Sequence, residues 1–337
     1  MTVSRLDRMR GEYRYRPAWW LPGGHTQTLW GKLARRARAP ALITERIATP
    51  DGDQVEVHSA GPRNATRHLL LLHGLAGTIR SHYVRGILSE SARLGYHATL
   101  MLFRGCGDAP NVARRFYHSG ETTDVDHVFT VLRQRAPHAT WFAAGVSLGG
   151  NVLLKWLGEQ GTGSVIRATA AVSVPFDLEA GARAIERGFA RIYDRHFLRS
   201  LRRKALEKLE RFPDLCDRER LLRARSVFEF DEAVTAPVHG FESAHDYYSR
   251  SSSLGFLERI RVPTLLLSAA DDPFLENWVL PRVEALARGN PALHTEFHPR
   301  GGHVGFVGGI APWRASYYAE RRLFDFFDAV EAGAPRS

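Results

Sequence analysis

Residues 139–157 read ATWFAAGVSLGGNVLLKWL: an apolar run, then Gly-Val-Ser-Leu-Gly, then apolar residues at helical spacing. This order predicts a buried strand, a sharp turn and a helix. Gly145, Ser147 and Gly149 have the spacing of a nucleophile elbow, which strains the serine backbone and brings neighbouring elements against both glycines. The Leu148 N–H at the start of the helix is then placed to stabilise an oxyanion. A serine that merely caps the helix is the alternative.

The composition favours one large core with an insertion. The chain has 337 residues, of which 44% are hydrophobic. Cys106 and Cys216 are too few for a disulfide framework and have no metal-ligand spacing around them, which indicates a reducing compartment. The first residues lack an apolar leader, and no stretch is long enough to span a bilayer. We therefore expect a cytoplasmic protein with no integral membrane segment.

The formal net charge of +10 suggests a nucleic-acid or anionic-membrane partner. Only four of the 46 basic residues are lysines, however, and the basic residues are spread along the chain. No recognised nucleic-acid reader motif is present. We therefore expect no nucleic-acid partner.

Strands and helices alternate on both sides of the elbow. The apolar run His68–Leu72 predicts a strand buried on both faces, and it ends in His-Gly-Leu-Ala-Gly. In folds that carry a nucleophile elbow, the loop after this strand supplies a second oxyanion donor, and the position selects the N–H of Leu75. A plain strand-to-helix turn that needs glycine is the alternative.

The alternation stops for residues 177–261, which show helical patterns and no clear strand. We interpret these residues as a helical cap inserted into a doubly wound, mostly parallel sheet, whose core comprises residues 42–176 and 262–337. Residues 1–41 form an Arg-rich, aromatic arm; packing of its tryptophans on the core is favoured over a membrane-surface anchor.

Six arginines recur every four residues within the predicted cap. If that segment is one helix, they form a slowly rotating stripe. A solvated, partly paired face is favoured over a site for an anionic ligand. The stripe comprises Arg183, Arg187, Arg191, Arg195, Arg199 and Arg203.

An acid and a histidine follow the last two predicted strands of the sheet. The strand Thr264–Ser268 leads into Asp271 and Asp272, and the strand Leu293–Phe297 leads into His303. Serine, acid and histidine in this chain order at three strand ends are typical of the α/β-hydrolase triad. Only one of two successive aspartates can reach the histidine. The pattern Gly-x-x-Asp and the proline after Asp272 favour Asp272, which leaves Asp271 for a hydrogen bond to nearby backbone.

The chain resembles the YheT-like branch of the α/β-hydrolase superfamily over nearly its whole length. The resemblance rests on Pro17-Ala18-Trp19-Trp20-Leu21-Pro22, His73-Gly74-Leu75 with Gly77, Arg104-Gly105-Cys106-Gly107, Tyr117-His118-Ser119-Gly120-Glu121-Thr122, Gly145-Val146-Ser147-Leu148-Gly149-Gly150-Asn151, Asp246-Tyr247-Tyr248, Asp271-Asp272-Pro273-Phe274 and Gly301-Gly302-His303-Val304-Gly305-Phe306. It implies serine-dependent hydrolysis of carboxylic esters. Some relatives act on short acyl esters, and eukaryotic relatives with an N-terminal membrane anchor cleave phospholipids. This sequence shows no such anchor.

We therefore predict hydrolysis of short- to medium-chain acyl esters through an acyl-enzyme on Ser147, with His303 as base and Asp272 as its acid partner. The expected partner is a small-molecule ester or a lipid-like substrate, and no metal or organic cofactor is needed. Two alternatives stay open: an acyltransferase with the same triad, and a catalytically silent binding module on the same fold.

Overall fold

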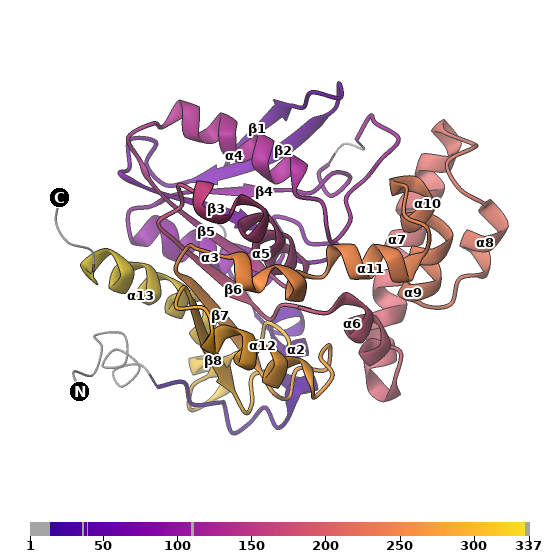
Figure 1. Ribbon diagram of the computed structural model, residues 1–337. Helices are drawn as coiled ribbons and strands as arrows, with labels where there is room; N and C mark the ends of the chain where they lie inside the picture. Colours follow the sequence, from indigo (N-terminus) through magenta and orange to yellow (C-terminus); the bar gives the residue numbers. More distant parts are fainter. Residues whose placement is uncertain (1–13, 36, 39, 109–110, 334–337) are drawn as a thin grey trace.

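A central eight-stranded sheet organises the molecule (Figure 1). The computed structural model describes residues 14–333 except 36, 39, 109 and 110. The strand order is β1-β2-β4-β3-β5-β6-β7-β8; β1 and β2 pair antiparallel, β2 pairs antiparallel with β4, and all other neighbours are parallel. The strands are β1 (Ile43–Ala48), β2 (Gln54–Ala60), β3 (Arg67–Leu72), β4 (His97–Met101), β5 (Thr140–Val146), β6 (Ala168–Val172), β7 (Thr264–Ala269) and β8 (Leu293–His298).

Helices cover both faces of this sheet (Figure 1). On one face α3 (His82–Arg93) packs against α13 (Tyr318–Gly333). On the other face α4 (Thr123–Arg135) and α5 (Leu148–Gln160) meet through Phe129 and Trp156, and α12 (Val279–Arg288) lies farther along. Parallel strands covered on both faces must be apolar throughout, which explains the buried run in β3. The predicted doubly wound, mostly parallel sheet is confirmed.

Between β6 and β7 the described chain forms helices only, and we call residues 177–261 the cap segment. It projects from one side of the sheet and contains an apolar cluster of its own, which includes Leu198 and Phe230 (Figure 1). Its helices are α6 (Leu178–Ile185), η2 (Gly188–Ala190), α7 (Arg191–Arg211), α8 (Arg218–Arg223), α9 (Val227–Phe230), η3 (Asp231–Thr235), α10 (Ala236–His239), α11 (Ala244–Ser251) and η4 (Ser253–Arg259).

The arginine stripe is not carried by a single helix. Helix α6 ends at Ile185, Gly188 adopts a positive φ of 50°, and α7 begins only at Arg191. A left-handed residue breaks a helix, so the four-residue spacing of the arginines spans two separate helices. Several of these arginines pair with carboxylates: Arg183 with Glu179, Arg187 with Glu276 and Arg203 with Glu207.

The N-terminal arm packs beside the loop that follows β8. Its helix α2 (Gly24–Leu33) is preceded by Ala18, whose N–H donates to the Val307 carbonyl, and by Trp20, whose Nε1 donates to the Gly309 carbonyl. Trp19 also donates to a carbonyl of this loop, that of Ile310, yet its side chain remains 78% exposed. Residues 1–13 of the predicted arm lie outside the described residues.

A second, two-stranded sheet was not predicted. It pairs β9 (Val307–Gly308) with β10 (Ser316–Tyr317), and the last helix begins directly afterwards at Tyr318. Strands of two residues give no periodic signal, and their pairing depends on the arm, which bridges to Gly308 through Pro17.

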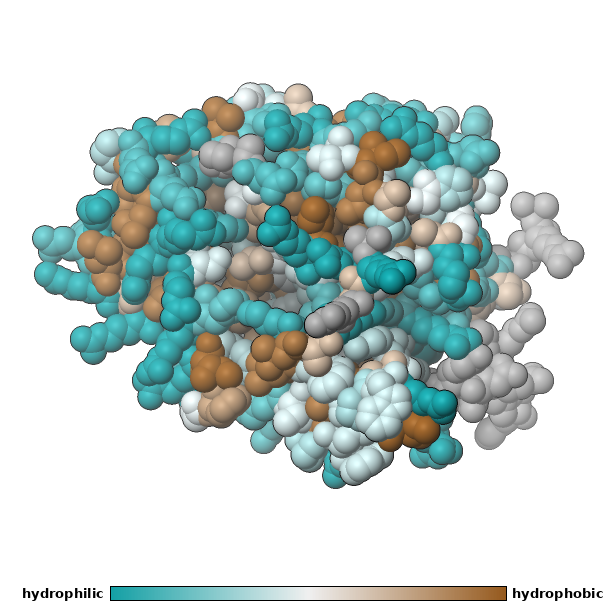
Figure 2. Space-filling view, turned by 180° about the vertical axis from the view of Figure 1, so that it is seen from behind, coloured by the Kyte–Doolittle hydropathy of each residue, from teal (hydrophilic) through white to brown (hydrophobic). Residues whose placement is uncertain are grey.

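Hydrophilic side chains cover most of the face in Figure 2, and apolar residues form scattered patches on it. The cap segment, at the left of that view, projects many hydrophilic side chains. None of the helices in the described part of the chain has the length and apolar character needed to cross a membrane.

Candidate active site

Ser147 lies at a tight turn between β5 and α5 and has a positive φ of 55°. The two flanking positions leave no room for a side chain larger than that of glycine. A Cβ on Gly145 would lie 2.4 Å from the Gly149 carbonyl oxygen, and a Cβ on Gly149 would lie 2.5 Å from the carbonyl oxygens of Leu72 and His73. Contacts this short with backbone cannot be relieved by a side-chain rotation. The predicted strand, strained turn and helix are all present.

Ser147, His303 and Asp272 form one chain of hydrogen bonds. His303 Nε2 lies 2.8 Å from Ser147 Oγ, and His303 Nδ1 lies 2.9 Å from Asp272 Oδ2. Asp272 and His303 are buried, whereas Ser147 is partly exposed. A carboxylate on Nδ1–H fixes the tautomer in which Nε2 can accept the serine proton. This is the arrangement of a serine nucleophile with its base and orienting acid.

Asp271 has a different set of partners. Its Oδ1 accepts hydrogen bonds of 2.8 Å from the N–H groups of Gly301 and Gly302, which begin the loop that carries His303. The two successive aspartates therefore point in different directions, as predicted. Asp272 contacts the imidazole, and Asp271 holds the backbone beside it.

The histidine loop is held by residues that the sequence analysis did not identify. Thr28 Oγ1 accepts from the His303 N–H at 2.9 Å, and Ser173 Oγ accepts from the Val304 N–H at 2.9 Å. The Gln27 side chain both donates to and accepts from the backbone of Val307. Helix α2 of the N-terminal arm thus fixes the loop on which His303 stands.

Aromatic residues cover His303. The ring of Phe274 stacks on the imidazole, and Tyr193 and Phe197 of α7 contact the ring of Phe274. Burial raises the pKa of the Tyr193 hydroxyl to about 12, and the charge of Asp272 adds to this effect. The cap segment therefore contributes to the apolar surroundings of the triad residues.

The Leu75 amide lies between two amides that are already engaged. The Gly74 N–H donates to the Tyr83 hydroxyl at 2.8 Å, and the Ala76 N–H donates to the Tyr117 hydroxyl at 3.0 Å. Burial raises the pKa of both hydroxyls, that of Tyr83 to about 12, so both stay neutral. These two tyrosines fix the loop on either side of Leu75, which is partly exposed, as is Ser147. The other predicted donor, the Leu148 N–H, begins α5 directly after the serine.

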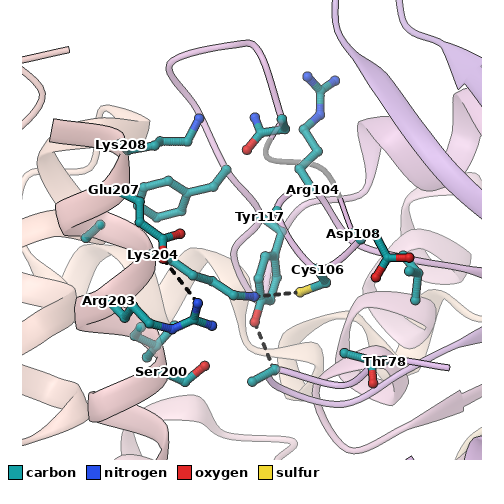
Figure 3. Close-up of a pocket in the computed structure, with 18 of the residues that line it drawn as sticks. Thr78, Arg104, Cys106, Asp108, Tyr117, Ser200, Arg203, Lys204, Glu207 and Lys208 are labelled. Carbon is teal, nitrogen blue, oxygen red and sulfur yellow. Dashed lines mark hydrogen bonds and ion pairs between the residues drawn. The ribbon is translucent and has the colours of Figure 1, made fainter. Parts of the chain in front are cut away.

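A cavity of about 600 Å³ lies between α7 and the loops that follow β3 and β4 (Figure 3). Its wall includes Ala76, Tyr117 and Leu201. The cavity therefore reaches the residue next to Leu75. Across the described ranges, no group of three or more His, Cys, Asp or Glu side chains is arranged to hold a metal ion.

The family model of the alpha/beta hydrolase fold matches residues 67–309. The chain belongs to the α/β-hydrolase family. The match includes β3 and its loop, the elbow, the whole cap segment and the histidine loop.

Similar proteins agree with this family assignment. The Escherichia coli (strain K12) protein named "Putative esterase YheT" is 38% identical over 290 residues, which are 85% of this chain and 84% of that protein. Human Phospholipase ABHD3 is 29% identical over 325 residues, which are 94% of this chain and 79% of that protein. The Pyrococcus furiosus esterase Pf2001 superimposes with a TM-score of 0.57 at 16% identity over 86% of this chain and 91% of that one, which shows a shared fold. The predicted family and fold are confirmed, and the relatives' names agree with the prediction of an ester hydrolase.

Proposed function

We propose that this protein hydrolyses carboxylic esters of short to medium acyl chains through an acyl-enzyme on Ser147. The observation that carries the proposal is the pair of hydrogen bonds made by His303, 2.8 Å to Ser147 Oγ and 2.9 Å to Asp272 Oδ2. This geometry is the requirement for activating a hydroxyl that is a weak nucleophile at neutral pH. The names of the YheT and phospholipase relatives agree with the reaction class.

In the first step Ser147 Oγ attacks the ester carbonyl carbon while His303 Nε2 accepts the serine proton. The carbonyl oxygen becomes an oxyanion, and the N–H groups of Leu148 and Leu75 donate hydrogen bonds to it. Asp272 stabilises the imidazolium that forms. The imidazolium then gives its proton to the leaving alcohol, and the acyl group stays on the serine.

In the second step water attacks the acyl-enzyme, and His303 Nε2 again accepts the proton. Collapse of the second tetrahedral intermediate releases the carboxylic acid and restores the Ser147 hydroxyl. The chain's own residues supply every proton transfer in this scheme. We further propose that residues 177–261 act as a cap that selects the substrate and that the protein works in the cytoplasm.

The proposal is tested by hydrolysis of p-nitrophenyl esters whose acyl chains range from acetate to dodecanoate. We expect wild-type activity that is highest at short to medium chains and a loss of about 10³- to 10⁵-fold in kcat for Ser147→Ala. Ser164→Ala is the control, because Ser164 follows the short helix η1 (Gly161–Gly163) away from the elbow, and the substitution should leave activity unchanged. Folded wild-type protein that hydrolyses none of these esters would contradict the proposal. Transfer of the acyl group to an added alcohol in preference to water would instead identify an acyltransferase.

A further inference from the structure

The cavity beside the oxyanion loop is lined by two lysines of α7 (Figure 3). Lys204 and Lys208 are one helical turn apart, and they are two of the four lysines in the chain. Residues at this spacing lie on the same face of a helix. Both lysines therefore line the same cavity, in a protein whose other basic residues are almost all arginines.

Lys204 points toward the loop after β4. Its Nζ lies 3.2 Å from Cys106 Sγ and 5.8 Å from the centroid of the Tyr117 ring. No ion pair joins Lys204 to a carboxylate anywhere in residues 14–333 as described. A partly buried ammonium without a carboxylate is available to a ligand.

Lys208 is buried deeper in the same wall. Its Nζ donates to the carbonyl oxygens of Ala113 and Arg115. Burial, together with the charges of Arg211 and Arg104, lowers the pKa of Lys208 to about 8, and the charge of Asp53 opposes this effect. Within the described residues, no carboxylate forms an ion pair with Lys208.

The carboxylates around the cavity do not neutralise these lysines. Asp108, Glu207 and Glu210 are exposed at the rim, and Glu207 pairs with Arg203. Glu56 pairs with His58 and Arg46. The wall also holds Arg80, Arg104, Arg203 and Arg211, and its apolar residues include Ile79, Leu102, Phe116, Leu201 and Phe230. A fitting ligand thus has an apolar body and an anionic end.

The cavity comes near the proposed oxyanion loop at Ala76 and Tyr117, which both line it. The Tyr117 ring faces Lys204, and its hydroxyl accepts from the N–H of Ala76, the residue after Leu75. We propose that Lys204, with Lys208 behind it, binds an anionic group, a carboxylate or a phosphate, on the ester substrate that Ser147 attacks. This inference rests on the proposed esterase function and adds the substrate's charge to it.

The test compares matched substrates that differ in the anion alone. The carboxylate pair is p-nitrophenyl hexanoate and p-nitrophenyl hydrogen adipate, and the phosphate pair is 1-butyrylglycerol and 1-butyrylglycerol 3-phosphate. We expect wild-type protein to favour the acidic member of at least one pair by about tenfold in kcat/KM, chiefly through KM, since one charge-assisted hydrogen bond is of that size. The pair that shows the preference identifies the anion.

Lys204→Met should abolish this preference and leave the neutral member of each pair within about twofold of wild type. Lys204→Arg keeps the charge and should retain most of the preference. Arg199→Met is the matched control, because Arg199 is exposed on the same helix and lies outside the cavity wall; it should leave the preference unchanged. Equal preference in wild type and Lys204→Met, or a wild-type preference for neutral esters in both pairs, would overturn the proposal.

A binding measurement separates this inference from the proposed chemistry. Calorimetry of Ser147→Ala with monomethyl adipate should give an affinity about tenfold higher than that of Ser147→Ala/Lys204→Met, with methyl hexanoate as the neutral reference. This difference supports the anion site even where wild-type protein turns over no ester. Equal affinities in the two variants would refute the anion site even where wild-type protein is an active esterase.

Discussion

The ring of Phe274 lies flat against the imidazole of His303, with the two centroids 3.9 Å apart and the planes 10° apart. Phe274 also donates its backbone N–H to Asp272 Oδ1 at 2.9 Å. Phe274 thus packs against one face of the imidazole, and its backbone N–H orients the Asp272 carboxylate that is hydrogen-bonded to His303 Nδ1. The arrangement accommodates the imidazolium of the proposed mechanism, because a cation is attracted to an aromatic face.

Phe274→Ala keeps the backbone hydrogen bond and removes the stacked ring. We expect a loss of roughly 10- to 100-fold in kcat on a neutral p-nitrophenyl ester, because the imidazole then loses its fixed orientation. Phe197→Ala is the matched control: Phe197 meets the edge of Phe274 at 5.8 Å and should change kcat much less. A Phe274→Ala enzyme with kcat within twofold of wild type would show that the stacked ring only fills space.

The two neighbouring aspartates should respond differently to the same substitution. Asp272→Asn should lower kcat by about 10⁴-fold, because an amide at this position favours the wrong imidazole tautomer. Asp271→Asn retains an oxygen that can accept from Gly301 and Gly302, so it should retain most of the activity. Steady-state kinetics on both variants, with folding checked by circular dichroism, decides the assignment. A larger loss in Asp271→Asn would move the acid role to Asp271.

Much of the site could be predicted from the sequence because its signals are local. Gly145, Ser147 and Gly149 stand within five residues, and the strands before Asp272 and His303 are continuous apolar or mixed runs that end in turn residues. The order of these features along the chain then limits the fold to very few alternatives. The preference for Asp272 over Asp271 as the partner of His303 also came from the local turn sequence and agrees with the geometry.

The supports of the site could not be predicted, because they depend on contacts between distant segments. Thr28 and His303 are 275 positions apart, and Ala76 and Tyr117 are 41 apart. Threonine and tyrosine at such positions give no periodic or motif signal before the fold is known. The arginine stripe does not lie on the single helix considered for it, for a local reason: Gly188 adopts a positive φ, which interrupts the helix between α6 and α7.

Gly149→Ala tests the packing of the elbow. The new Cβ would lie 2.5 Å from two carbonyl oxygens, and relieving this overlap should cost about 1–3 kcal/mol or more of the free energy of unfolding. Gly163→Ala is the control, because a Cβ there meets only the end of the Gln160 side chain at 3.9 Å. Urea denaturation should show destabilisation in Gly149→Ala alone. Equal stability of the two variants would contradict the close approach of β3 and α5.

Asp231 should make the stability of the protein depend on pH. This carboxyl is buried in η3, where Tyr248 and Thr235 donate to it, and burial raises its pKa to about 6 in spite of these two bonds. Because the pKa of Asp231 is higher in the folded protein than in the unfolded chain, protonation of this carboxyl stabilises the fold. The stabilisation is therefore fully present below about pH 4 and is lost as the pH rises to about 6, by roughly 3 kcal/mol in total.

Asp231→Asn removes this titration while keeping an oxygen acceptor. The stability of the variant relative to wild type should therefore rise between about pH 4 and pH 7, by up to roughly 3 kcal/mol. Urea denaturation at several pH values measures the difference, and Asp246→Asn, at a partly exposed carboxylate of α11 that pairs with Arg250, is the control that should show a much smaller trend. A difference between Asp231→Asn and wild type that stays constant with pH would contradict this account of the buried carboxyl.

The most direct test of the whole account is the site at which a fluorophosphonate probe reacts. The hydrogen bond that the Ser147 hydroxyl donates to His303 Nε2 predicts covalent labelling of Ser147, found by mass spectrometry on the peptide that spans residues 139–157. Labelling should be absent in Ser147→Ala and strongly slowed in His303→Ala. Folded wild-type protein that stays unlabelled, or that is labelled at another serine, would contradict the claim that Ser147 is an activated nucleophile.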